Sequence, residues 1–344
     1  MKTVTVSASK TYDVCIGPGL LNRLGQGCSQ LGGALRVCIV SDTNVAPLYE
    51  DRARSSLEAA GFTVCRFVIR AGEQSKNAAN YLSLLNTLAE NGITRTDLIV
   101  ALGVGVVGDL AGFAAATYLR GIRFVQVPTT VLAAVDSSVG GKTAIDLDAG
   151  KNLAGAFCQP SLVLCDTATL DTLPEDIFRD GCAEVIKYGV LYDEALFSSL
   201  EQTGLAFSRE EVIARCVELK RDVVMEDEFD TGARMLLNLG HTVGHSIEKV
   251  SGFSVTHGKA VAMGMAIIAR GTGCKDADRI TRLLEQFGLP TRCGYGADVL
   301  YGPTLRDKKR TADGVHLIIP EAIGRCRVEK VPCERLKTIF KAGL

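Results

Sequence analysis

Three of the four histidines in this chain lie within seventeen residues: His241, His245 and His257. Intervals of four, three and four, the spacing of one α-helix face, connect Arg234, Asn238, His241 and His245. A core helix would carry leucine at such positions, and most residues between them are apolar. The spacing therefore predicts a single helix whose polar stripe lines a pocket.

These histidines suit a metal site, because imidazole and carboxylate are ligands of catalytic zinc and the chain has no C-x-x-C pair. His241 and His257 with Glu184 would leave positions open for a substrate. A competing set uses His241 and His245, which are four residues apart. We prefer His257 because it precedes an apolar helix whose N-terminal dipole would keep the imidazole neutral. His316 is expected to be a packing residue.

Two lysines occupy helical positions that need an explanation. Lys220 continues the apolar row of Cys216 and Val224, so it either points into a pocket or extends its stem along apolar surface with its ammonium in water. Glu184 and Lys187 share a helix face, for which the simplest interpretation is an exposed ion pair.

A glycine-rich turn, Gly103–Asp109, follows an apolar strand and opens into a predicted helix at Leu110–Tyr118. Such a turn lets the backbone approach a pyrophosphate at a helix N-terminus, although packing alone can also require the glycines. No acidic residue follows about 20 positions later, and the ribose-binding candidate is instead Asp42 upstream. We therefore expect a strand order that differs from the usual Rossmann order.

The segment from Pro128 to Asn152 is rich in hydroxyls and glycines and carries Lys142 and Lys151. Together these groups predict a binding site for phosphate or another anion. The alternative is a solvated loop, but the apolar run Val131–Val135 favours a path through the interior.

The first half alternates strand and helix, which predicts a parallel sheet covered by helices, with ligands at the carboxyl ends of the strands. The predicted strands are Met1–Val6, Leu35–Val40, Phe62–Val68 and Leu98–Leu102, and the predicted helices are Pro47–Ala60, Lys76–Glu90, Val212–Val224 and Ala260–Ala269. Beyond about residue 171 helical patterns dominate, and Val315–Pro320 is the only clear strand. We predict an α/β domain at 1–170 and a mostly helical domain at 171–344.

The composition is that of a globular enzyme. The chain has 344 residues, 47% of them hydrophobic, and a formal net charge of −1. Without a long basic run, nucleic acid and anionic membranes are not the expected partners. No stretch of about 18 apolar residues occurs, so we expect a soluble, cytoplasmic protein.

Several motifs closely resemble those of the 3-dehydroquinate synthase family of sugar-phosphate cyclases, in the same order over essentially the whole chain. They are Gly105–Phe113, Tyr118–Gly121, Val125–Thr130, Asp136–Thr143, Ala183–Gly189 and Leu237–His245. The resemblance implies an α/β Rossmann-like NAD-binding domain and a mainly α-helical C-terminal domain, the dehydroquinate synthase-like fold. It also implies NAD and a divalent metal, zinc or cobalt.

The family's reaction converts 3-deoxy-D-arabino-heptulosonate 7-phosphate to 3-dehydroquinate and phosphate, in the shikimate pathway to aromatic amino acids. The resemblance implies a transient NAD oxidation, phosphate elimination, return of the hydride and intramolecular aldol closure, as in a lyase. The alternatives are another cyclase, of valiolone or amino-dehydroquinate type, and a metal- and NAD-dependent polyol dehydrogenase.

The resemblance also implies roles for individual residues. It places in the catalytic and substrate site Arg120, Asp136, Lys142, Asn152, Lys187, Lys220, Arg234, Asn238, His245 and Lys309. It places around NAD Asp42, Asn44, Glu73, Lys76, Gly105, Val106, Val107, Gly108, Asp109, Thr129, Thr130, Lys142, Lys151 and Thr172. It assigns the metal to Glu184, His241 and His257. Arg120 is expected to reach the neighbouring active site of a homodimer.

Two residues depart from the family pattern. Val104 stands where a third consecutive glycine is common, so a positive φ there would strain the loop and weaken cofactor binding. Lys259 stands where an acidic residue is frequent, and a cation in the first turn of a helix is unfavourable by roughly 0.3 to 1 kcal/mol.

Overall fold

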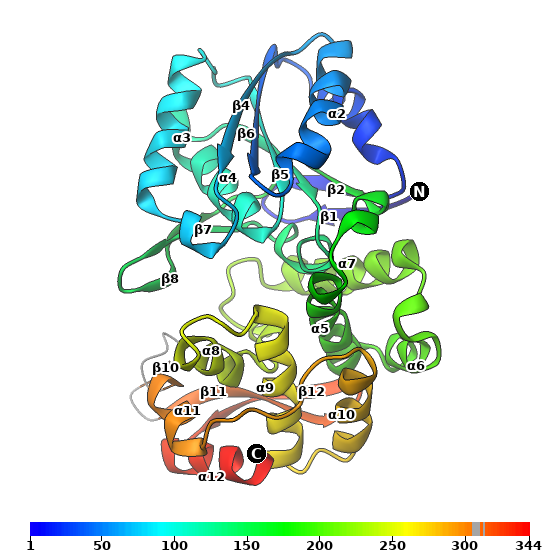
Figure 1. The fold of residues 1–344 in the computed structure, drawn as a ribbon, viewed down its shortest axis with the longest axis vertical. Helices are drawn as coiled ribbons and strands as arrows, with labels where there is room; N and C mark the ends of the chain where they lie inside the picture. The colour runs from blue at the N-terminus through cyan, green and yellow to red at the C-terminus, as the bar shows by residue number, and fades with distance from the viewer. Residues whose placement is uncertain (305–309, 312–313) are drawn as a thin grey trace. The chain divides into compact units, whose positions relative to one another are not determined.

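The computed structural model describes residues 1–304, 310–311 and 314–344, and Lys309 lies outside the described residues. The chain divides into two compact units (Figure 1), Met1–Leu173 with Arg209–Phe229, and Pro174–Ser208 with Asp230–Leu344. The chain first passes from one unit to the other after residue 173, three residues beyond the predicted domain boundary at residue 170. Residues 209–229 then belong to the first unit again, which a division into two continuous domains does not include.

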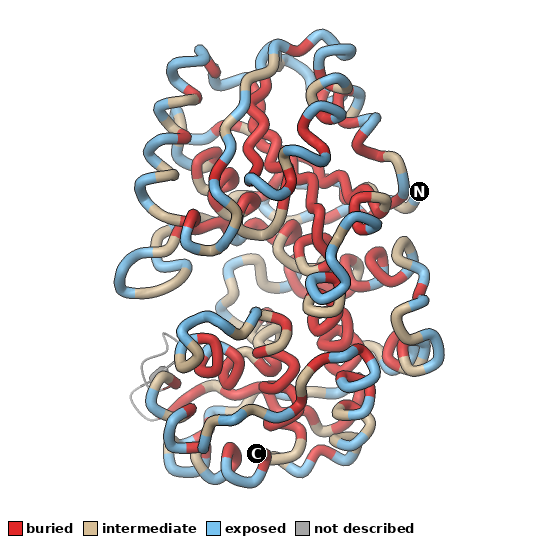
Figure 2. Tube along the Cα trace, viewed as in Figure 1, coloured by how far each residue is buried: buried red, intermediate tan, exposed pale blue. Residues whose placement is uncertain are grey.

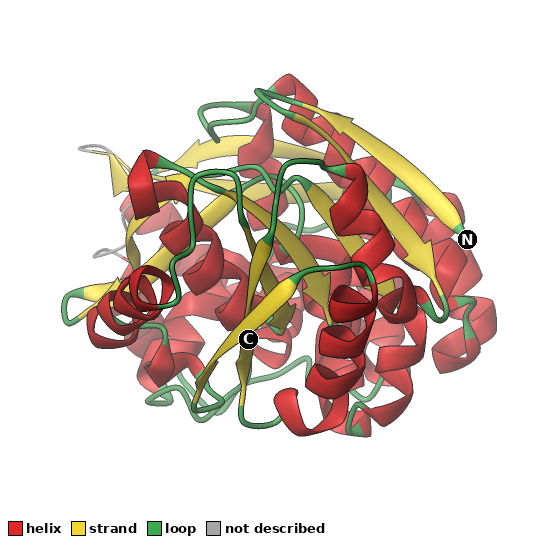
Figure 3. Ribbon diagram, turned by 90° about the horizontal axis from the view of Figure 1, so that it is seen from above, coloured by secondary structure: helices red, strands yellow, loops and turns green. Residues whose placement is uncertain are grey.

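The first unit is built on a seven-stranded sheet in the order β1-β2-β9-β6-β5-β3-β4. Its strands are β1 (Lys2–Ser7), β2 (Thr11–Gly17), β3 (Arg36–Asp42), β4 (Thr63–Ile69), β5 (Leu98–Gly103), β6 (Arg123–Pro128) and β9 (Leu162–Asp166). β1 pairs antiparallel with β2 and lies at the sheet edge (Figure 3), whereas the other neighbours are parallel. A separate antiparallel hairpin consists of β7 (Lys142–Leu147) and β8 (Gly150–Phe157).

The helices of the first unit mostly connect successive strands. The α-helices are α1 (Leu24–Gln30), α2 (Ala46–Ala59), α3 (Ala78–Glu90), α4 (Gly105–Thr117) and α7 (Arg209–Glu226). The shorter turns of helix are η1 (Leu20–Arg23), η2 (Glu73–Ser75), η3 (Tyr118–Arg120), η4 (Ala133–Ser137) and η5 (Thr167–Thr172). The four predicted strands agree with β1, β3, β4 and β5 to within a few residues, whereas β2, β6 and β9 were not predicted. α4 begins at Gly105 and not at Leu110.

Each face of the parallel sheet has its own hydrophobic core. Val37 and Ile39 of β3 belong to the core under α1 and α2, while Cys38 and Val40 belong to the core under α3 and α4. Alternate residues of one strand therefore point to opposite faces, and both faces are covered by helices. This explains why β5 is apolar without interruption and buried along its length (Figure 2).

The order of the parallel strands changes direction between β3 and β5. From β3 the chain passes to β4 on one side, and then returns to β5 on the other side of β3. The order β4-β3-β5-β6-β9 corresponds to a doubly wound sheet other than the usual Rossmann order, which confirms the predicted difference. In such sheets, ligands bind at the strand carboxyl ends beside this switch point. Here Asp42 ends β3 and Gly103 ends β5.

The second unit packs helices around a small antiparallel sheet. Its helices are α5 (Glu175–Tyr192), α6 (Glu194–Thr203), η6 (Gly204–Ala206), η7 (Ala233–Asn238), α8 (His241–Val250), α9 (His257–Gly271), α10 (Ala277–Gln286), α11 (Ala297–Thr304) and α12 (Cys333–Gly343). Its strands are β10 (Arg310–Thr311), β11 (Gly314–Ala322) and β12 (Arg325–Val331). Among the helices of the described ranges, none is long and apolar enough to cross a membrane.

The prediction of Val315–Pro320 as the only strand of this half is wrong. β11 pairs along its length with β12, and β10 pairs with the start of β11. β12 escaped detection because four of its seven residues are charged and most of the strand is solvent-accessible. Its stability comes from pairing with the buried β11, which a local hydrophobic pattern does not reveal.

Candidate active site and metal centre

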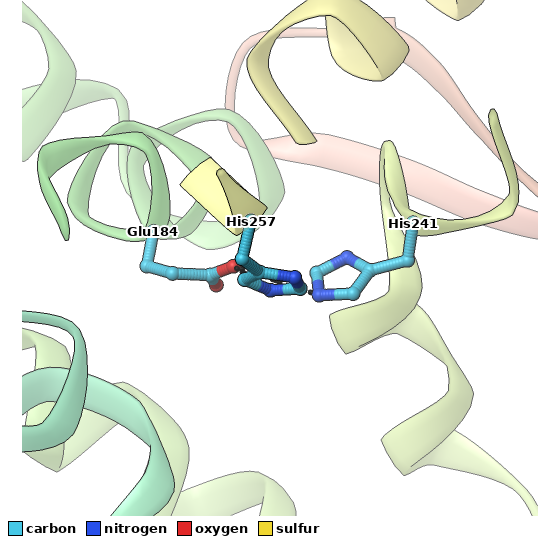
Figure 4. Close-up of side chains that lie close together, drawn as sticks. All are labelled: Glu184, His241 and His257. Carbon is cyan, nitrogen blue, oxygen red and sulfur yellow. Dashed lines mark ion pairs between the residues drawn. The ribbon is translucent and has the colours of Figure 1, made fainter. Parts of the chain in front are cut away.

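Three predicted metal ligands converge in the second unit. Glu184 projects from α5, while His241 and His257 are the first residues of α8 and α9 (Figure 4). Glu184 Oε1 lies 3.5 Å from Nε2 of His241 and 3.5 Å from Nε2 of His257. One ligand atom from each of the three residues lies within 4.8 Å of the others. Two imidazoles and one carboxylate at this spacing could hold a divalent cation.

The predicted single helix through Arg234, Asn238 and His241 is wrong. The 3-10 helix η7 ends at Asn238, and α8 starts afresh at His241 after Gly240 takes a left-handed conformation, with φ of 78°. A side chain at Gly240 would bring Cβ within 2.6 Å of the Val261 carbonyl oxygen of α9. The close approach of two helices therefore breaks the helix and requires glycine.

The predicted polar stripe is buried at only one end. Arg234 is 2% exposed and Asn238 is half-buried, with Nδ2 donating to the Met235 carbonyl at 3.0 Å. His245 is exposed, although its ring centroid lies 5.5 Å from that of His241. The break at Gly240 explains why one face does not continue from Arg234 to His245.

The described residues form two potential ligand groups, and His257 belongs to both. One contains Glu184, His241 and His257, and the other contains His245, Glu248 and His257. The competing set that pairs His241 with His245 forms neither group. The ligand assignment itself stays a prediction, and the geometry favours the choice of His257.

Glu248 is a site residue that the sequence reasoning missed. It is buried on α8, and its Oε1 lies 3.6 Å from Nδ1 of His257, while the other ring nitrogen faces Glu184. A carboxylate behind the second nitrogen commonly orients a metal-binding histidine. The sequence does contain one indication of this role. Glu248 follows His245 by three residues, so the two side chains share a helix face.

The expectation that a helix dipole keeps His257 neutral is wrong for the metal-free protein. Burial lowers the pKa of His257, but hydrogen bonding and the charges of Glu184 and Glu248 outweigh that effect and raise the pKa to about 10. Two nearby carboxylates act more strongly on the imidazole than the partial charge of one helix end does. A metal would therefore have to displace a proton.

Metal affinity is expected to rise with pH for this reason. Because His257 is protonated below about pH 10 in the metal-free protein, binding releases one proton and the affinity should rise about tenfold per pH unit up to that value. The ion pairs of protonated His257 stabilise the metal-free fold below its unfolded pKa and are lost as pH rises through about 10.

Titration of metal-free protein with Zn²⁺ against a chelator of known affinity, over a pH series, measures this rise. In Glu248→Gln one of the two charges is removed, so the rise should level off at lower pH. An affinity independent of pH from about 7 to 9 would contradict the protonation of His257.

The prediction of an exposed ion pair between Glu184 and Lys187 is wrong. Both side chains are only 1% exposed, and Lys187 Nζ makes a close ion pair with Glu184 Oε2. Lys187 Nζ also lies 5.3 Å from the centre of the Tyr188 ring. A buried cation therefore lies directly against the candidate metal ligand, where charge interactions are stronger than at the surface.

Lys220 is buried in the first unit and does not extend its ammonium into water. It is 4% exposed, and Nζ donates to Oδ1 of Asp136 at 2.9 Å and also to the Asp136 carbonyl. Asp136 lies in η4, directly after Val131 and Ala133–Val135, which are buried. The predicted interior path is therefore confirmed for this part of the segment, whereas its end at Gly150–Asn152 is solvent-accessible. Two predicted site residues, Lys220 and Asp136, contact each other.

Several residues predicted around NAD also have structural roles at strand ends. Oδ1 of Asp42 accepts the amides of Asn44 at 2.8 Å and Val45 at 3.0 Å, which shapes the turn into α2. Thr130 Oγ1 accepts the Ala133 amide at 3.2 Å. The Thr172 hydroxyl hydrogen-bonds with that of Tyr49.

The glycine-rich turn places the N-terminus of α4 at the switch point. Val104 is the N-cap, and no side chain of the described residues caps this helix, so its first amides suit an anion. The turn also carries the predicted cofactor residues Val106 and Val107. The predicted residue Thr129 follows β6, and its amide donates to the Gly103 carbonyl of the turn at 3.1 Å.

The expected strain at Val104 is absent, because its φ of −81° is ordinary for valine. Gly105 and Gly108 do not adopt a positive φ and instead allow close packing against the side chains of Ser137 and Gln126. A Cβ at Gly108 would lie 2.6 Å from Gln126 Oε1, and one at Gly105 would lie 3.1 Å from Ser137 Oγ.

Val104→Gly is therefore expected to leave the dissociation constant of NAD within about twofold of the parent value. There is no backbone strain for the glycine to relieve. Calorimetric titration of NAD measures this, with Gly108→Ala as a contrasting variant that should weaken binding through its contact with Gln126. Clearly tighter binding by Val104→Gly would show that valine distorts the turn.

Lys76 is buried and lies among three partly exposed carboxylates. Its Nζ lies 3.0 Å from Glu73 Oε1, 3.1 Å from Asp109 Oδ2 and 3.8 Å from Asp146 Oδ1. Burial lowers the pKa of Lys76, but these carboxylates raise it to about 12, and burial raises the pKa of Asp109 to about 6. Lys76 therefore connects η2, α4 and β7 through paired charges.

The remaining predicted residues lie on the β7–β8 hairpin and the α4–β6 connection. Lys142 is exposed at the start of β7, and Lys151 Nζ lies 3.8 Å from Glu73 Oε1. The amide of Asn152 donates to Asp146 Oδ1 at 2.8 Å. Arg120 is exposed with a φ of 68°.

Solved structures with this fold include two synthases that hold NAD⁺ and a divalent metal. A 2-deoxy-scyllo-inosose synthase complexed with carbaglucose-6-phosphate, NAD⁺ and Co²⁺ matches with a TM-score of 0.90 and 25% identity, covering 100% of both chains. The 2-epi-5-epi-valiolone synthase from Streptomyces hygroscopicus, with NAD⁺ and Zn²⁺ bound, has a TM-score of 0.85 and 26% identity over 98% of this chain and 97% of that chain. A glycerol dehydrogenase from Schizosaccharomyces pombe shares the fold, with a TM-score of 0.68 and 16% identity over 99% of this chain and 90% of that chain.

Sequence relatives are more specific. Residues 66–180 match the family model of the 3-dehydroquinate synthase N-terminal region, and residues 181–310 match that of its C-terminal region. The 3-dehydroquinate synthase of Pelobacter propionicus is 47% identical, over 98% of this chain and 99% of its own length. That of Enterococcus faecalis is 42% identical, over 99% of this chain and 98% of its own length. The resemblance in the sequence motifs is thus confirmed, and this chain belongs to the 3-dehydroquinate synthase family.

Proposed function

We propose that this enzyme is a phosphate-eliminating lyase that converts 3-deoxy-D-arabino-heptulosonate 7-phosphate to 3-dehydroquinate and phosphate, with NAD and a divalent metal. The observation that carries the proposal is the convergence of Glu184, His241 and His257 beside buried Lys187, in a chain of this family. Solved cyclases with the same fold hold NAD⁺ with Co²⁺ or Zn²⁺.

The donor set fits a zinc or cobalt ion, because it offers one carboxylate and two imidazoles and no thiolate. When bound, the metal would polarise a substrate hydroxyl, and NAD would accept and later return a hydride. Glu184, His241 and His257 would hold the ion. Glu248 would orient the His257 ring through its second nitrogen.

The resemblance to the family implies a substrate that carries both a carboxylate and a phosphate, and three buried cations are available to bind it. Lys187, Lys220 and Arg234 are at most 4% exposed, and the ammonium groups of Lys187 and Lys220 are paired with Glu184 and Asp136. We assign these three to binding and orienting the anionic substrate. The proposed set is completed by Asp136, Lys142, Asn152, Asn238, His245 and Lys309.

We assign NAD to the first unit, and the metal and much of the substrate to the second. The switch point between β3 and β5 supports the NAD assignment, since it brings Asp42 and the uncapped N-terminus of α4 to one edge of the sheet. Asp109 and Lys76 would then fix the first turns of α4 relative to β7. Holding groups in place is much of what this type of chemistry needs from a protein.

The first test is phosphate release from the heptulosonate phosphate with substoichiometric NAD and Zn²⁺, while NADH absorbance is recorded. The lyase predicts phosphate without accumulating NADH, and no phosphate after chelation of the metal. NADH without phosphate would indicate a polyol dehydrogenase. Preference for sedoheptulose 7-phosphate, which lacks the carboxylate, would indicate another cyclase.

We also propose a homodimer in which Arg120 of one subunit reaches the active site of the other. The support is local: Leu119 and Arg120 both have positive φ, at 52° and 68°, and both are exposed. Two adjacent non-glycine residues in this region cost roughly 1 to 2 kcal/mol each, a strain often found at functional positions.

Mixing two inactive variants tests this proposal. Arg120→Ala and Lys220→Met subunits, unfolded together and refolded, should recover about a quarter of the parent activity, because half of random dimers would be mixed and each mixed dimer would have one intact site. Each variant refolded alone should stay inactive and is the control. No recovery in verified mixed dimers would place Arg120 in its own subunit's site.

A further inference from the structure

The N-terminus of α9 is bound by a carboxylate from another helix. Asp180 lies on α5, and its Oδ2 accepts the Gly258 amide at 3.0 Å while its Oδ1 accepts the Lys259 amide at 2.9 Å. The Thr256 hydroxyl also donates to Oδ1 of Asp180. One carboxylate therefore takes three donors from the first turn of α9 and its cap residue.

This arrangement replaces the usual local cap. Thr256 is the N-cap residue of α9, but its side chain caps no amide of that helix. In a capping box, Thr256 would bond the third amide, and an acid at the position of Lys259 would bond back to the cap residue. Lys259 is a cation, so this half of the box is missing, and Asp180 supplies the negative charge from α5.

The contact between the two helices is close and specific. A Cβ at Gly258 would lie 1.9 Å from the Asp180 carbonyl oxygen, so only glycine permits this approach. Asp180 and Glu184 are four residues apart on α5 and lie on one face, one turn from each other. α5 thus contacts the residue after His257 through Asp180, and His257 itself through Glu184.

We propose that Asp180 is the positioning residue of the metal centre: it caps α9 from outside and fixes His257 opposite Glu184. Asp180 acts on the residues on either side of His257, where it accepts hydrogen bonds from the Thr256 hydroxyl before it and from the Gly258 amide after it. This inference rests on the proposed function, because the metal is the group that Glu184 and His257 would share. The carboxylate of Asp180 also supplies, at the N-terminus of α9, the negative charge that an acidic residue in place of Lys259 would otherwise provide.

A double-mutant cycle of Asp180→Ala and Lys259→Glu tests the proposal. Asp180→Ala should weaken Zn²⁺ binding about 10- to 100-fold and lower the melting temperature of the metal-free protein. Lys259→Glu alone should be unfavourable, because it places a second acid beside Asp180. In Asp180→Ala the same substitution should recover affinity, since Thr256 and Glu at position 259 would complete the capping box.

Three measurements are needed on each variant: the melting temperature without metal, Zn²⁺ affinity by chelator competition, and the visible absorption spectrum with Co²⁺. The Co²⁺ spectrum reports ligand geometry and should change in Asp180→Ala. NAD affinity is measured in parallel and should not change. If Asp180→Ala does not fold, Asp180→Asn keeps one acceptor oxygen and is expected to show the same losses to a smaller degree.

Asp193→Ala is the matched control. Asp193 follows the other end of α5 and caps α6, where its Oδ1 accepts the Leu196 amide at 2.9 Å. Its removal should lower the melting temperature without weakening Zn²⁺ binding. If Asp180→Ala behaves in the same way, Asp180 is only a structural cap and the proposal is overturned. If the parent protein itself binds no Zn²⁺, the proposed function fails, whereas the stability cycle without metal still tests the cap.

Discussion

Replacement of Glu184 by glutamine is expected to remove metal binding and activity together. Glu184 is the only carboxylate in the candidate ligand set and faces both imidazoles at 3.5 Å. Loss of a residue that only orients a ligand costs about 10- to 100-fold in metal affinity, so loss of a ligand should exceed about 100-fold. Chelator competition with Zn²⁺ and the phosphate-release assay measure the two effects.

Stability must be separated from metal binding in this variant. Glutamine would leave the buried ammonium of Lys187 without its anionic partner, which costs about 3 to 5 kcal/mol in comparable buried pairs. The double variant Glu184→Gln/Lys187→Met removes both charges and should recover most of the stability. It should still fail to bind Zn²⁺. Recovery of Zn²⁺ binding in the double variant would show that Glu184 supports the fold and is not a ligand.

Lys220→Met should lower kcat/KM by about a hundredfold or more while leaving Zn²⁺ and NAD affinities close to those of the parent. Lys220 is 4% exposed and donates to Asp136, so truncating it removes one partner of a buried charge pair. Because the metal ligands belong to the other compact unit, the effect should fall on substrate turnover. Steady-state phosphate release measures the loss of kcat/KM, and Zn²⁺ titration shows whether metal affinity is unchanged.

A second lysine of the same unit provides a matched control for Lys220. Lys10 is partly buried, and its Nζ donates to Ser161 Oγ at 2.6 Å, outside the proposed site. Lys10→Met also removes an ammonium and one hydrogen bond and should keep the parent kcat/KM. Equal losses in the two variants would show that any lysine removed from this unit impairs the fold, and would contradict a substrate role for Lys220.

Local patterns were enough to predict β1, β3, β4 and β5 and the helices α2 and α3 between them, but they led to no prediction of β2, β6 or β9. β5 reads as an unbroken apolar run because both sheet faces are covered, and the glycine-rich turn marks the junction of β5 and α4. The absence of an acidic residue about 20 positions after the turn correctly predicted a different strand order. Where local chemistry was ambiguous, as at Val104, only the observed φ resolved it.

Long-range contacts decided what the patterns missed. The predicted helix breaks at Gly240 because the backbone of α9 packs directly against this residue. The local sequence around Gly240 does not show that α9 will lie there. Glu248 resembles any helix acid until His257 is placed beside it. Likewise, Glu184 and Lys187 have the spacing of a surface pair, and only the packing around α5 buries them.

By itself, the sequence determined the residue types able to bind a metal, an anion and a dinucleotide, together with the elements that carry them. Only the tertiary structure decided which candidates meet, which are buried, and which groups from distant segments, such as Asp180 and Glu248, act on His257. The physical reason is that periodicity and turn chemistry act between neighbours in sequence. Burial, charge pairing and helix capping across elements depend on groups that are adjacent only after the chain has folded.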